Sequence, residues 1–173
     1  MKKMNKTILV VDDEADVRNY LKSALENSGF DVITANNGLE ALEVMAKTTP
    51  DLISLDLVMP KHSGIRFYRD IQKNKDWAKI PVLIITGHAR DELGKVDFET
   101  MMMTGPGVYL EKPVKPFTYI EKVCQLLGLE VPENIAQMDK DSEEEQRKKM
   151  LDSLSKADTE SLKKALDAIK KNQ

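Results

Sequence analysis

The sequence predicts an α/β fold: a doubly wound parallel sheet of five strands, with helices on both faces and a short helical extension at the C-terminus. One observation behind this prediction is that short apolar runs, typical of strands buried on both faces, alternate with segments of helical periodicity. The other is that several of these runs stop at a polar side chain. A strand that ends in this way delivers the side chain to the sheet edge where α/β proteins bind ligands.

The N-terminal part of the chain contains the first two predicted strand–helix units. Apolar residues 8–11 predict the first strand, and the next helix has one apolar face and is expected to end at Gly29 as its C′ residue. That face consists of Val17, Leu21, Ala24 and Leu25. The second strand is expected at 31–35, and the helix after it ends before Pro50.

Three more units follow. The third strand is expected at 52–55, with Gly64 preceding a helix through Ile65, Tyr68 and Ile71. The fourth strand is expected at 82–85. A helix is expected within 90–104, the fifth strand at 108–110 and a last helix at 117–127. Five such units predict a parallel sheet with right-handed crossovers.

Five polar residues follow the predicted strands: Asp12, Asp13, Asp56, Thr86 and Lys112. Clustered carboxylates repel one another unless a cation lies among them, and Mg²⁺ commonly binds one or two carboxylates while leaving positions for phosphate oxygens. A lysine and a threonine hydroxyl can each contact a phosphate oxygen. The pattern therefore favours a phosphate site with Mg²⁺, and no histidine or cysteine has the spacing of a zinc or redox-metal site.

Composition narrows the class of protein. The net charge of −3 over 173 residues gives no electrostatic footprint for nucleic acid. The single cysteine, Cys124, excludes an internal disulfide and lies on an apolar helix face, where a buried thiol is expected. No apolar segment is long enough to span a bilayer. We therefore expect a cytoplasmic protein that is neither exported nor bound to a membrane or to nucleic acid.

The order of these residues resembles the receiver domain of bacterial response regulators in two-component systems. The matching pattern runs from about Lys6 to Gly128, and we expect residues 1–129 to form this domain. Its members are Asp12-Asp13, Asp56 with Met59-Pro60 and Gly64, Thr86, and Tyr109 three residues before Lys112-Pro113. Taken singly, each has a simpler explanation, such as a loop cap for Asp56 or a solvated side chain for Lys112. Taken together and in this order, these residues indicate the functional site of such a receiver domain.

The resemblance implies a flavodoxin-like strand order, 2-1-3-4-5, and a role for each matching residue. Asp56 would be the phosphoacceptor, taking a phosphoryl group from a sensor histidine kinase or a histidine phosphotransfer protein. Asp13, Asp56 and the main-chain carbonyl of Val58 would bind Mg²⁺ directly, and Asp12 would bind it through water.

Further roles follow from the same resemblance. Lys112 and Thr86 would contact the phosphoryl oxygens, and Tyr109 would change rotamer as Thr86 moves. His88 occupies a variable position near the site, where it would either touch the phosphoryl region or, as we favour, lie on a solvated loop. The protein would be no enzyme beyond promoting its own phosphorylation and dephosphorylation. Its output surface would be the fourth helix, fifth strand and fifth helix, in contact with a downstream protein.

Residues 130–173 differ in composition from the rest of the chain. They are rich in Lys, Glu, Asp, Ala and Leu, with no glycine or aromatic residue, which is typical of helices without a large core. We expect a charged two-helix hairpin with its turn at 155–157, anchored by Leu162 and Leu166. Its apolar stripes are too short to be stable alone, so it would dock on the receiver, on a second copy of the chain as a homodimer, or on a partner. Acids and bases are interspersed along it, which favours protein contact over DNA binding as the output.

Two alternatives from other classes remain open. A receiver-like scaffold that is not phosphorylated would be expected to lose Asp56, Lys112 or the acid pair, and all are present. A phosphatase with an aspartyl-phosphate intermediate would use similar residues. Such a phosphatase would, however, usually carry a second aspartate two residues after the first, as Asp-x-Asp, and this chain has the glutamate Glu14 there. It would also need a cap domain, which the chain is too short to supply.

Overall fold

The computed structural model describes residues 3–60, 63–87, 108–137, 147–149 and 151–152. The chain divides into two compact units, Met1–Pro132 and Glu133–Gln173. No helix in the described part of the chain is both long and apolar enough to cross a membrane.

The first unit contains one parallel sheet, whose five described strands lie in the order β2-β1-β3-β4-β5. Their bounds are β1 Thr7–Val11, β2 Asp31–Ala35, β3 Leu52–Leu55, β4 Val82–Thr86 and β5 Tyr109–Glu111. Every neighbouring pair is parallel. This confirms the predicted fold class and strand order.

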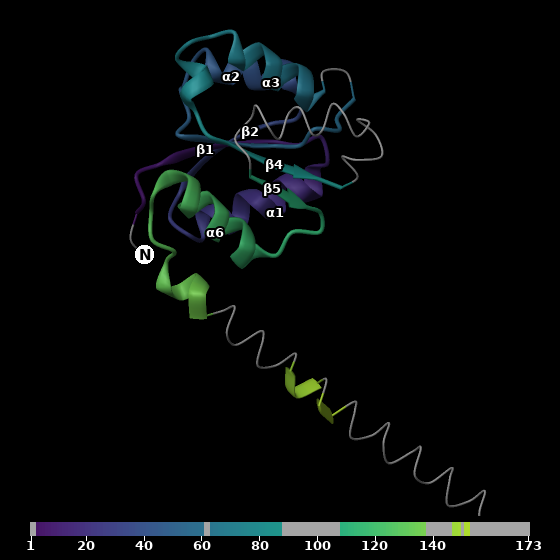
Figure 1. Ribbon diagram of the computed structural model, residues 1–173, viewed down its shortest axis with the longest axis vertical. Helices are drawn as coiled ribbons and strands as arrows, with labels where there is room; N and C mark the ends of the chain where they lie inside the picture. The colour runs from purple at the N-terminus through teal and green to yellow at the C-terminus, as the bar shows by residue number, and fades with distance from the viewer. Residues whose placement is uncertain (1–2, 61–62, 88–107, 138–146, 150, 153–173) are drawn as a thin grey trace, which may run out of the picture. The chain divides into compact units, whose positions relative to one another are not determined.

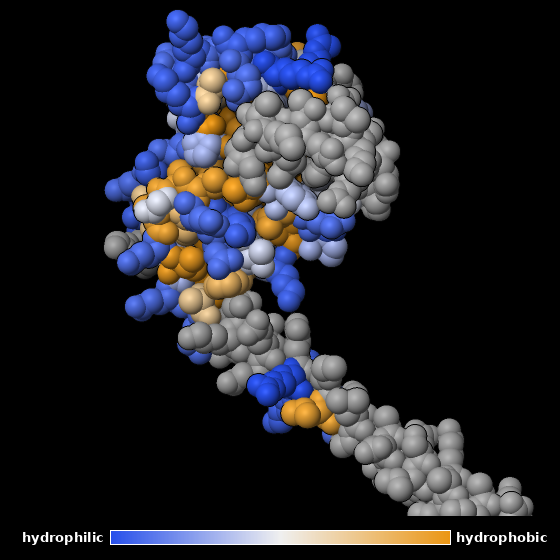
Figure 2. Space-filling model, viewed as in Figure 1, coloured by the Kyte–Doolittle hydropathy of each residue, from blue (hydrophilic) through white to orange (hydrophobic). Residues whose placement is uncertain are grey.

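Helices cover both faces of the sheet (Figure 1). Helices α2 (Gly38–Met45) and α3 (Gly64–Gln72) pack together on one face, and α1 (Ala15–Glu26) and α6 (Pro116–Leu127) pack together on the other. A short 3-10 helix, η1 (Trp77–Lys79), precedes β4. Polar side chains cover the outer side of α2 and α3, whereas apolar side chains gather over α6 (Figure 2).

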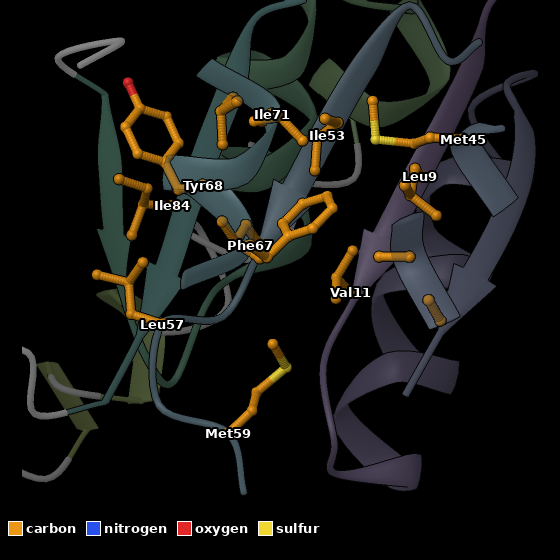
Figure 3. Close-up of a cluster of buried hydrophobic side chains, with 14 residues drawn as sticks. Leu9, Val11, Met45, Ile53, Leu57, Met59, Phe67, Tyr68, Ile71 and Ile84 are labelled. Carbon is orange, nitrogen blue, oxygen red and sulfur yellow. The ribbon is translucent and has the colours of Figure 1, made fainter. Parts of the chain in front are cut away.

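The face under α2 and α3 holds an apolar core (Figure 3). Alternate residues of the central strands point into it, among them Leu9 and Val11 of β1 and Ile53 and Leu55 of β3, all at most 1% exposed. Phe67 of α3 fills the space between the helices and the sheet. Burying a side chain of this size contributes about 1.5–3 kcal/mol, so this layer supplies much of the stability of the first unit.

The opposite face carries a second buried layer. Ile8 and Val10 of β1 lie against α1 and α6, whose inner sides contribute Leu21, Leu25, Ile120, Val123 and Cys124. Cys124 is a buried free thiol, as the sequence predicts, and burial raises its pKa to about 11. Two polar side chains also lie in this layer, Ser54 of β3 and Tyr119 of α6.

Several helix ends have a local cause in the sequence. Asn37 accepts hydrogen bonds from the amides of Leu39 and Glu40 and so caps α2. The Ser63 hydroxyl accepts from Arg66 N at the start of α3. Gly128, with φ of 65°, ends α6 in the left-handed conformation that a glycine adopts without steric cost.

Several predicted boundaries are wrong by one residue, among them the end of the first helix and the start of the fifth strand. The helix α1 has Asn27 as its C-cap, so Gly29 lies one position beyond the C′ residue; its φ of 89° serves the turn into β2 instead. The fifth strand begins at Tyr109 rather than at 108, because Val108 contributes only its carbonyl, which accepts from Ile84 N. The helix predicted within 90–104 lies outside the described residues.

The second unit is helical where it is described, at residues 133–137, 147–149 and 151–152. Leu151 is 60% exposed. The turn predicted at 155–157 and the anchors Leu162 and Leu166 lie outside the described residues, so the two-helix hairpin stays a prediction.

Gly64 is required by a close backbone contact. A Cβ added there would lie 1.9 Å from the carbonyl oxygen of Asp56. We expect Gly64→Ala to lower the free energy of unfolding by about 3 kcal/mol, because the backbone itself must shift to make room. Urea unfolding measures this. Gly87→Ala is the control, since a Cβ there meets nothing within 4 Å, and its effect should stay within about 0.5 kcal/mol. Equal losses in the two variants would contradict the steric explanation.

Candidate functional site

Three carboxylates meet at the edge of the sheet where β1 and β3 end. Asp12 and Asp13 follow β1, and Asp56 follows β3, which is the strand paired with β1. Their oxygen atoms lie within 4.8 Å of one another. The structure therefore brings together the acids that the sequence predicts to converge.

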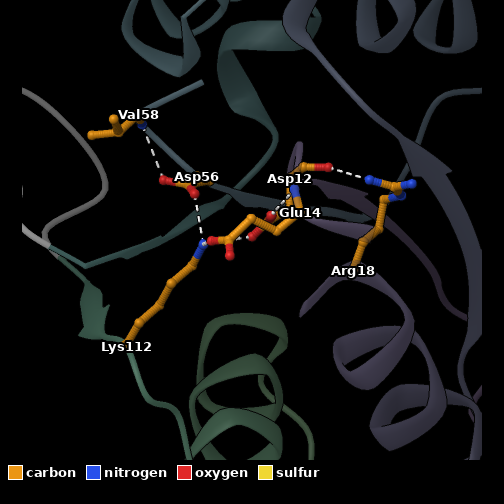
Figure 4. A network of polar contacts seen from close by, with 6 residues as sticks. All are labelled: Asp12, Glu14, Arg18, Asp56, Val58 and Lys112. Carbon is orange, nitrogen blue, oxygen red and sulfur yellow. Dashed lines mark hydrogen bonds and ion pairs between the residues drawn. The ribbon is translucent and has the colours of Figure 1, made fainter. Parts of the chain in front are cut away.

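The Asp56 carboxylate is held from two sides. One oxygen accepts a hydrogen bond of 3.0 Å from Val58 N, and the other lies 2.7 Å from Lys112 Nζ (Figure 4). The side chain is nearly buried, with 4% of the residue exposed. Burial raises the pKa of Asp56 and the charge of Asp13 adds to the rise, which outweighs the opposing effects of Lys112 and the Val58 amide.

Asp12 lies deeper, at 1% exposed. Its Oδ1 accepts from Glu14 N at 2.9 Å, its Oδ2 lies 2.9 Å from Lys112 Nζ, and its main-chain carbonyl accepts from the Arg18 guanidinium at 2.6 Å. Burial is again the main cause that raises the pKa of this carboxyl, with Lys112 opposing it and Asp56 adding to it. Asp12 is thus oriented by the turn that leads into α1.

Lys112 reaches into the site from the loop after β5. Its Nζ contacts Asp56, Asp12 and, at 3.1 Å, Glu14. Its main-chain N donates to the carbonyl of Thr86, so the end of β4 fixes the start of the loop. Burial by itself would lower the pKa of the ammonium group, but the hydrogen bonds and charges of Asp56 and Asp12 raise it well above its usual value. Lys112 therefore stays charged.

Thr86 and Tyr109 lie on the two strands next to the acids. Thr86 is the last residue of β4 and is 2% exposed, and its hydroxyl makes no hydrogen bond to any of the described residues. Tyr109 begins β5, in register with Ile84 of β4, and is 40% exposed. The switch role assigned to these two residues stays a prediction. His88 lies outside the described residues.

Sequence reasoning missed two contributors to this site. The sequence assigns no role in the site to Glu14, yet its carboxylate pairs with Lys112, a residue 98 positions away. Arg18 holds the main chain at Asp12 from the first turn of α1. The only sequence signal was the third consecutive acid after the strand, because a contact between residues so far apart depends on the fold.

The donor set suits a hard divalent cation. Three carboxylates with oxygens in close proximity offer the ligands that Mg²⁺ prefers, and the raised pKa values of Asp12 and Asp56 show that their negative charges need further compensation. A cation bound among them would supply it. The cluster could therefore hold a metal ion.

Comparison with known proteins agrees with the geometry. The response regulator receiver domain matches residues 8–123 of the chain. The chain belongs to the response regulator receiver domain family. It is therefore a signalling domain of the two-component type.

Two relatives illustrate the range of the family. The chain is 42% identical over 113 residues to the alkaline phosphatase synthesis transcriptional regulatory protein PhoP of Bacillus subtilis, a match that covers 65% of this chain. It is 30% identical over 125 residues to the polar-differentiation response regulator DivK of Brucella anthropi, covering 72% of this chain and 98% of DivK. The chain spans only 45% of the length of PhoP.

Solved structures show the same fold. The receiver resembles the chemotaxis protein CheY4 of Vibrio cholerae, with a TM-score of 0.63 and 27% identity over 70% of this chain and 98% of that one. A response regulator receiver protein from Burkholderia phymatum gives a TM-score of 0.62 and 32% identity over 74% of this chain and 99% of that one.

The burial of the acids makes a prediction about stability. Because the folded pKa of Asp56 is raised, its ionised form destabilises the fold; this cost grows as the pH rises above the ordinary carboxyl pKa and is fully present above the folded pKa. We expect Asp56→Asn to raise the free energy of unfolding at neutral pH by on the order of 1 kcal/mol in EDTA. The gain should vanish near about pH 3, where the wild-type carboxyl is already protonated.

Asp51, at the other end of β3, is the matched control. Burial opposes the effect, but hydrogen bonds from Lys6 and the Thr7 amide hold its pKa below the usual value. Its ionised form therefore stabilises the fold above the ordinary pKa, and this contribution is lost as the pH falls through the folded pKa. Asp51→Asn should lower stability at neutral pH. Urea unfolding that showed the same sign for both variants would contradict this account.

Proposed function

We propose that this receiver accepts a phosphoryl group on Asp56 with the help of Mg²⁺. The observation that carries the proposal is the position of the Asp56 carboxylate, which is nearly buried at the carboxyl end of β3, next to β1, with a charged lysine 2.7 Å away. A carboxylate oxygen would attack the phosphorus of a phosphohistidine on a sensor kinase or a phosphotransfer protein. The P–O bond forms as the P–N bond breaks, and the imidazole leaves with the bonding electrons.

The metal proposal rests on the acid cluster. Asp13, Asp56 and the main-chain carbonyl of Val58 would hold Mg²⁺, and Asp12 would reach it through water. When bound, the ion supplies positive charge that offsets the negative charge developing on the phosphoryl oxygens. The Val58 amide, which donates to Asp56 Oδ1, leaves the second oxygen of Asp56 facing Lys112.

Lys112 and Thr86 would serve the phosphorylated state. A phosphoryl group adds about −1.5 to −2 charge and strong acceptor oxygens. Lys112 already points into the site, and the buried Thr86 hydroxyl has no partner among the described residues, so both are available to these oxygens. Movement of Thr86 would let Tyr109 change rotamer, which shifts the equilibrium between two states of the receiver.

We further propose that the output is contact with another protein, in the cytoplasm. One candidate is the surface of β5, α6 and the helix predicted within 90–104, supported by the apolar side chains that gather over α6 (Figure 2) and by the 40% exposure of Tyr109. The charged segment 130–173 is the other, as a helical extension that docks on a partner or on a second copy. Its mixed charges offer no basic face for DNA.

Phosphorylation is tested with a small phosphodonor and Mg²⁺. Intact mass should show one phosphoryl group added to the wild type and none to Asp56→Asn, because Asp56 alone combines the lysine with the acid pair. Asp51→Asn, at the opposite end of the same strand, should be labelled like the wild type. Labelling of Asp56→Asn, or none in the wild type, would overturn the assignment and favour a scaffold that is not phosphorylated.

Lys112 provides a test of the metal site. Its ammonium group lies within 3.1 Å of three carboxylates, so it competes with a cation for the same charges. We expect Lys112→Met to tighten Mg²⁺ binding by about three- to tenfold in calorimetry, since removing one charge at this distance is worth about 1 kcal/mol near a protein surface. The exposed Lys115→Met is the control and should leave the affinity unchanged. Weaker binding by Lys112→Met would show that the lysine does not compete with the metal.

A further inference from the structure

Tyr20 of α1 extends to the loop that carries Lys112. Its hydroxyl donates a hydrogen bond of 3.0 Å to the main-chain carbonyl of Val114, a residue 94 positions away in the chain. Val114 lies two residues after Lys112, in the loop between β5 and α6. The hydrogen bond therefore joins α1 to the segment that places the lysine among the carboxylates.

The loop between β5 and α6 is short of main-chain donors. It spans residues 112–115, and two prolines, Pro113 within it and Pro116 directly after it, have no N–H group to donate. Such a loop depends more on its carbonyl groups for hydrogen bonds to the rest of the fold. The Val114 carbonyl makes such a bond with Tyr20, a side chain that comes from a different element.

The same end of the fold contacts Lys112 at two further points. Glu14, the N-cap residue of α1, pairs with Lys112 Nζ at 3.1 Å (Figure 4), six residues before Tyr20 in the chain. Lys112 N donates to the carbonyl of Thr86, the last residue of β4. Because a lysine side chain is flexible, the place of its ammonium group depends on how firmly the main chain beneath it is held. The contact of Tyr20 with Val114 adds to that hold from the side of α1.

We propose that Tyr20 is a positioning residue for Lys112. Its hydroxyl holds the loop so that the ammonium group stays 2.7 Å from Asp56, where it would meet a phosphoryl oxygen. Tyr20 acts through the main chain of the loop and not by contact with the phosphoryl group. Loss of the hydroxyl should therefore slow phosphorylation, but it should not weaken Mg²⁺ binding, because the ammonium group competes with the cation. This inference rests on the proposed phosphorylation of Asp56.

Tyr20→Phe removes the hydroxyl, keeps the ring and so tests the proposal. With a small phosphodonor and saturating Mg²⁺, this variant should be phosphorylated about threefold more slowly than the wild type, as expected for the loss of one hydrogen bond at the surface. Its Mg²⁺ affinity in calorimetry should not fall. Tyr68→Phe removes the hydroxyl of a nearly buried tyrosine on the opposite face of the sheet and is the control, with the rate of the wild type. An unchanged rate in Tyr20→Phe, or an equal loss in both variants, would overturn the positioning role.

Amide hydrogen exchange in EDTA separates this inference from the proposed function. The Lys112 amide, which donates to Thr86, should exchange about threefold faster in Tyr20→Phe. The Asp51 amide, which donates to Thr7 at the other end of the sheet, should keep its rate, whereas a general loss of stability would speed both. If the wild type takes no phosphoryl group, the proposed function is wrong, and the Lys112 amide still shows whether Tyr20 holds the loop. If the wild type is phosphorylated but this amide exchanges at the same rate in Tyr20→Phe, only the positioning role is overturned.

Discussion

The parallel pairing of β1 with β3 is the constraint on which the site depends. Val11 lies in register with Leu55, so the residues after the two strands reach the sheet edge at the same level. Asp56 N donates to the carbonyl of Val11, which extends the pairing to the acid itself. A slip by one residue would turn the acids toward the opposite face and separate them. The apolar layers on both sides of the sheet oppose such a slip, because it would also expose their side chains.

The pairing of β1 with β3 brings buried carboxylates close together, and Lys112 offsets part of the cost of ionising them. Asp12 and Asp56 are nearly buried and close to a third carboxylate, so their ionised forms are costly. Lys112 offsets part of this cost with one ammonium group shared among acids from both strands. Truncating one partner of a buried charge network leaves the others uncompensated, so the loop after β5 is coupled to the ends of β1 and β3. A site with this surplus of negative charge is suited to take up a cation.

The two buried faces of the sheet differ in the polarity of their side chains. Under α2 and α3 the buried side chains form a continuous apolar cluster, with Phe67 against the sheet and Gly64 in contact with the backbone of Asp56. Under α1 and α6 the apolar layer is interrupted by the buried polar side chains of Ser54 and Tyr119, and Ser54 lies two residues before Asp56 on β3. The first face therefore mainly supplies stability, whereas the second combines packing with the polar environment of the site.

The sequence alone determined the strands, their alternation with helices and the polar residues that follow them, because hydrophobic periodicity and strand ends are local properties of the chain. Asp12, Asp13, Asp56, Thr86 and Lys112 could therefore be predicted as site residues. Boundaries such as the start of β5 were off by one residue, since they depend on which main-chain groups find a partner in the neighbouring strand. Only the tertiary structure could decide that Glu14 shares Lys112 with the buried acids. It also decided that Asp56 N donates to the carbonyl of Val11, which brings the acids after β1 and β3 together. These contacts join residues far apart in the chain, and no local pattern encodes the distance between them.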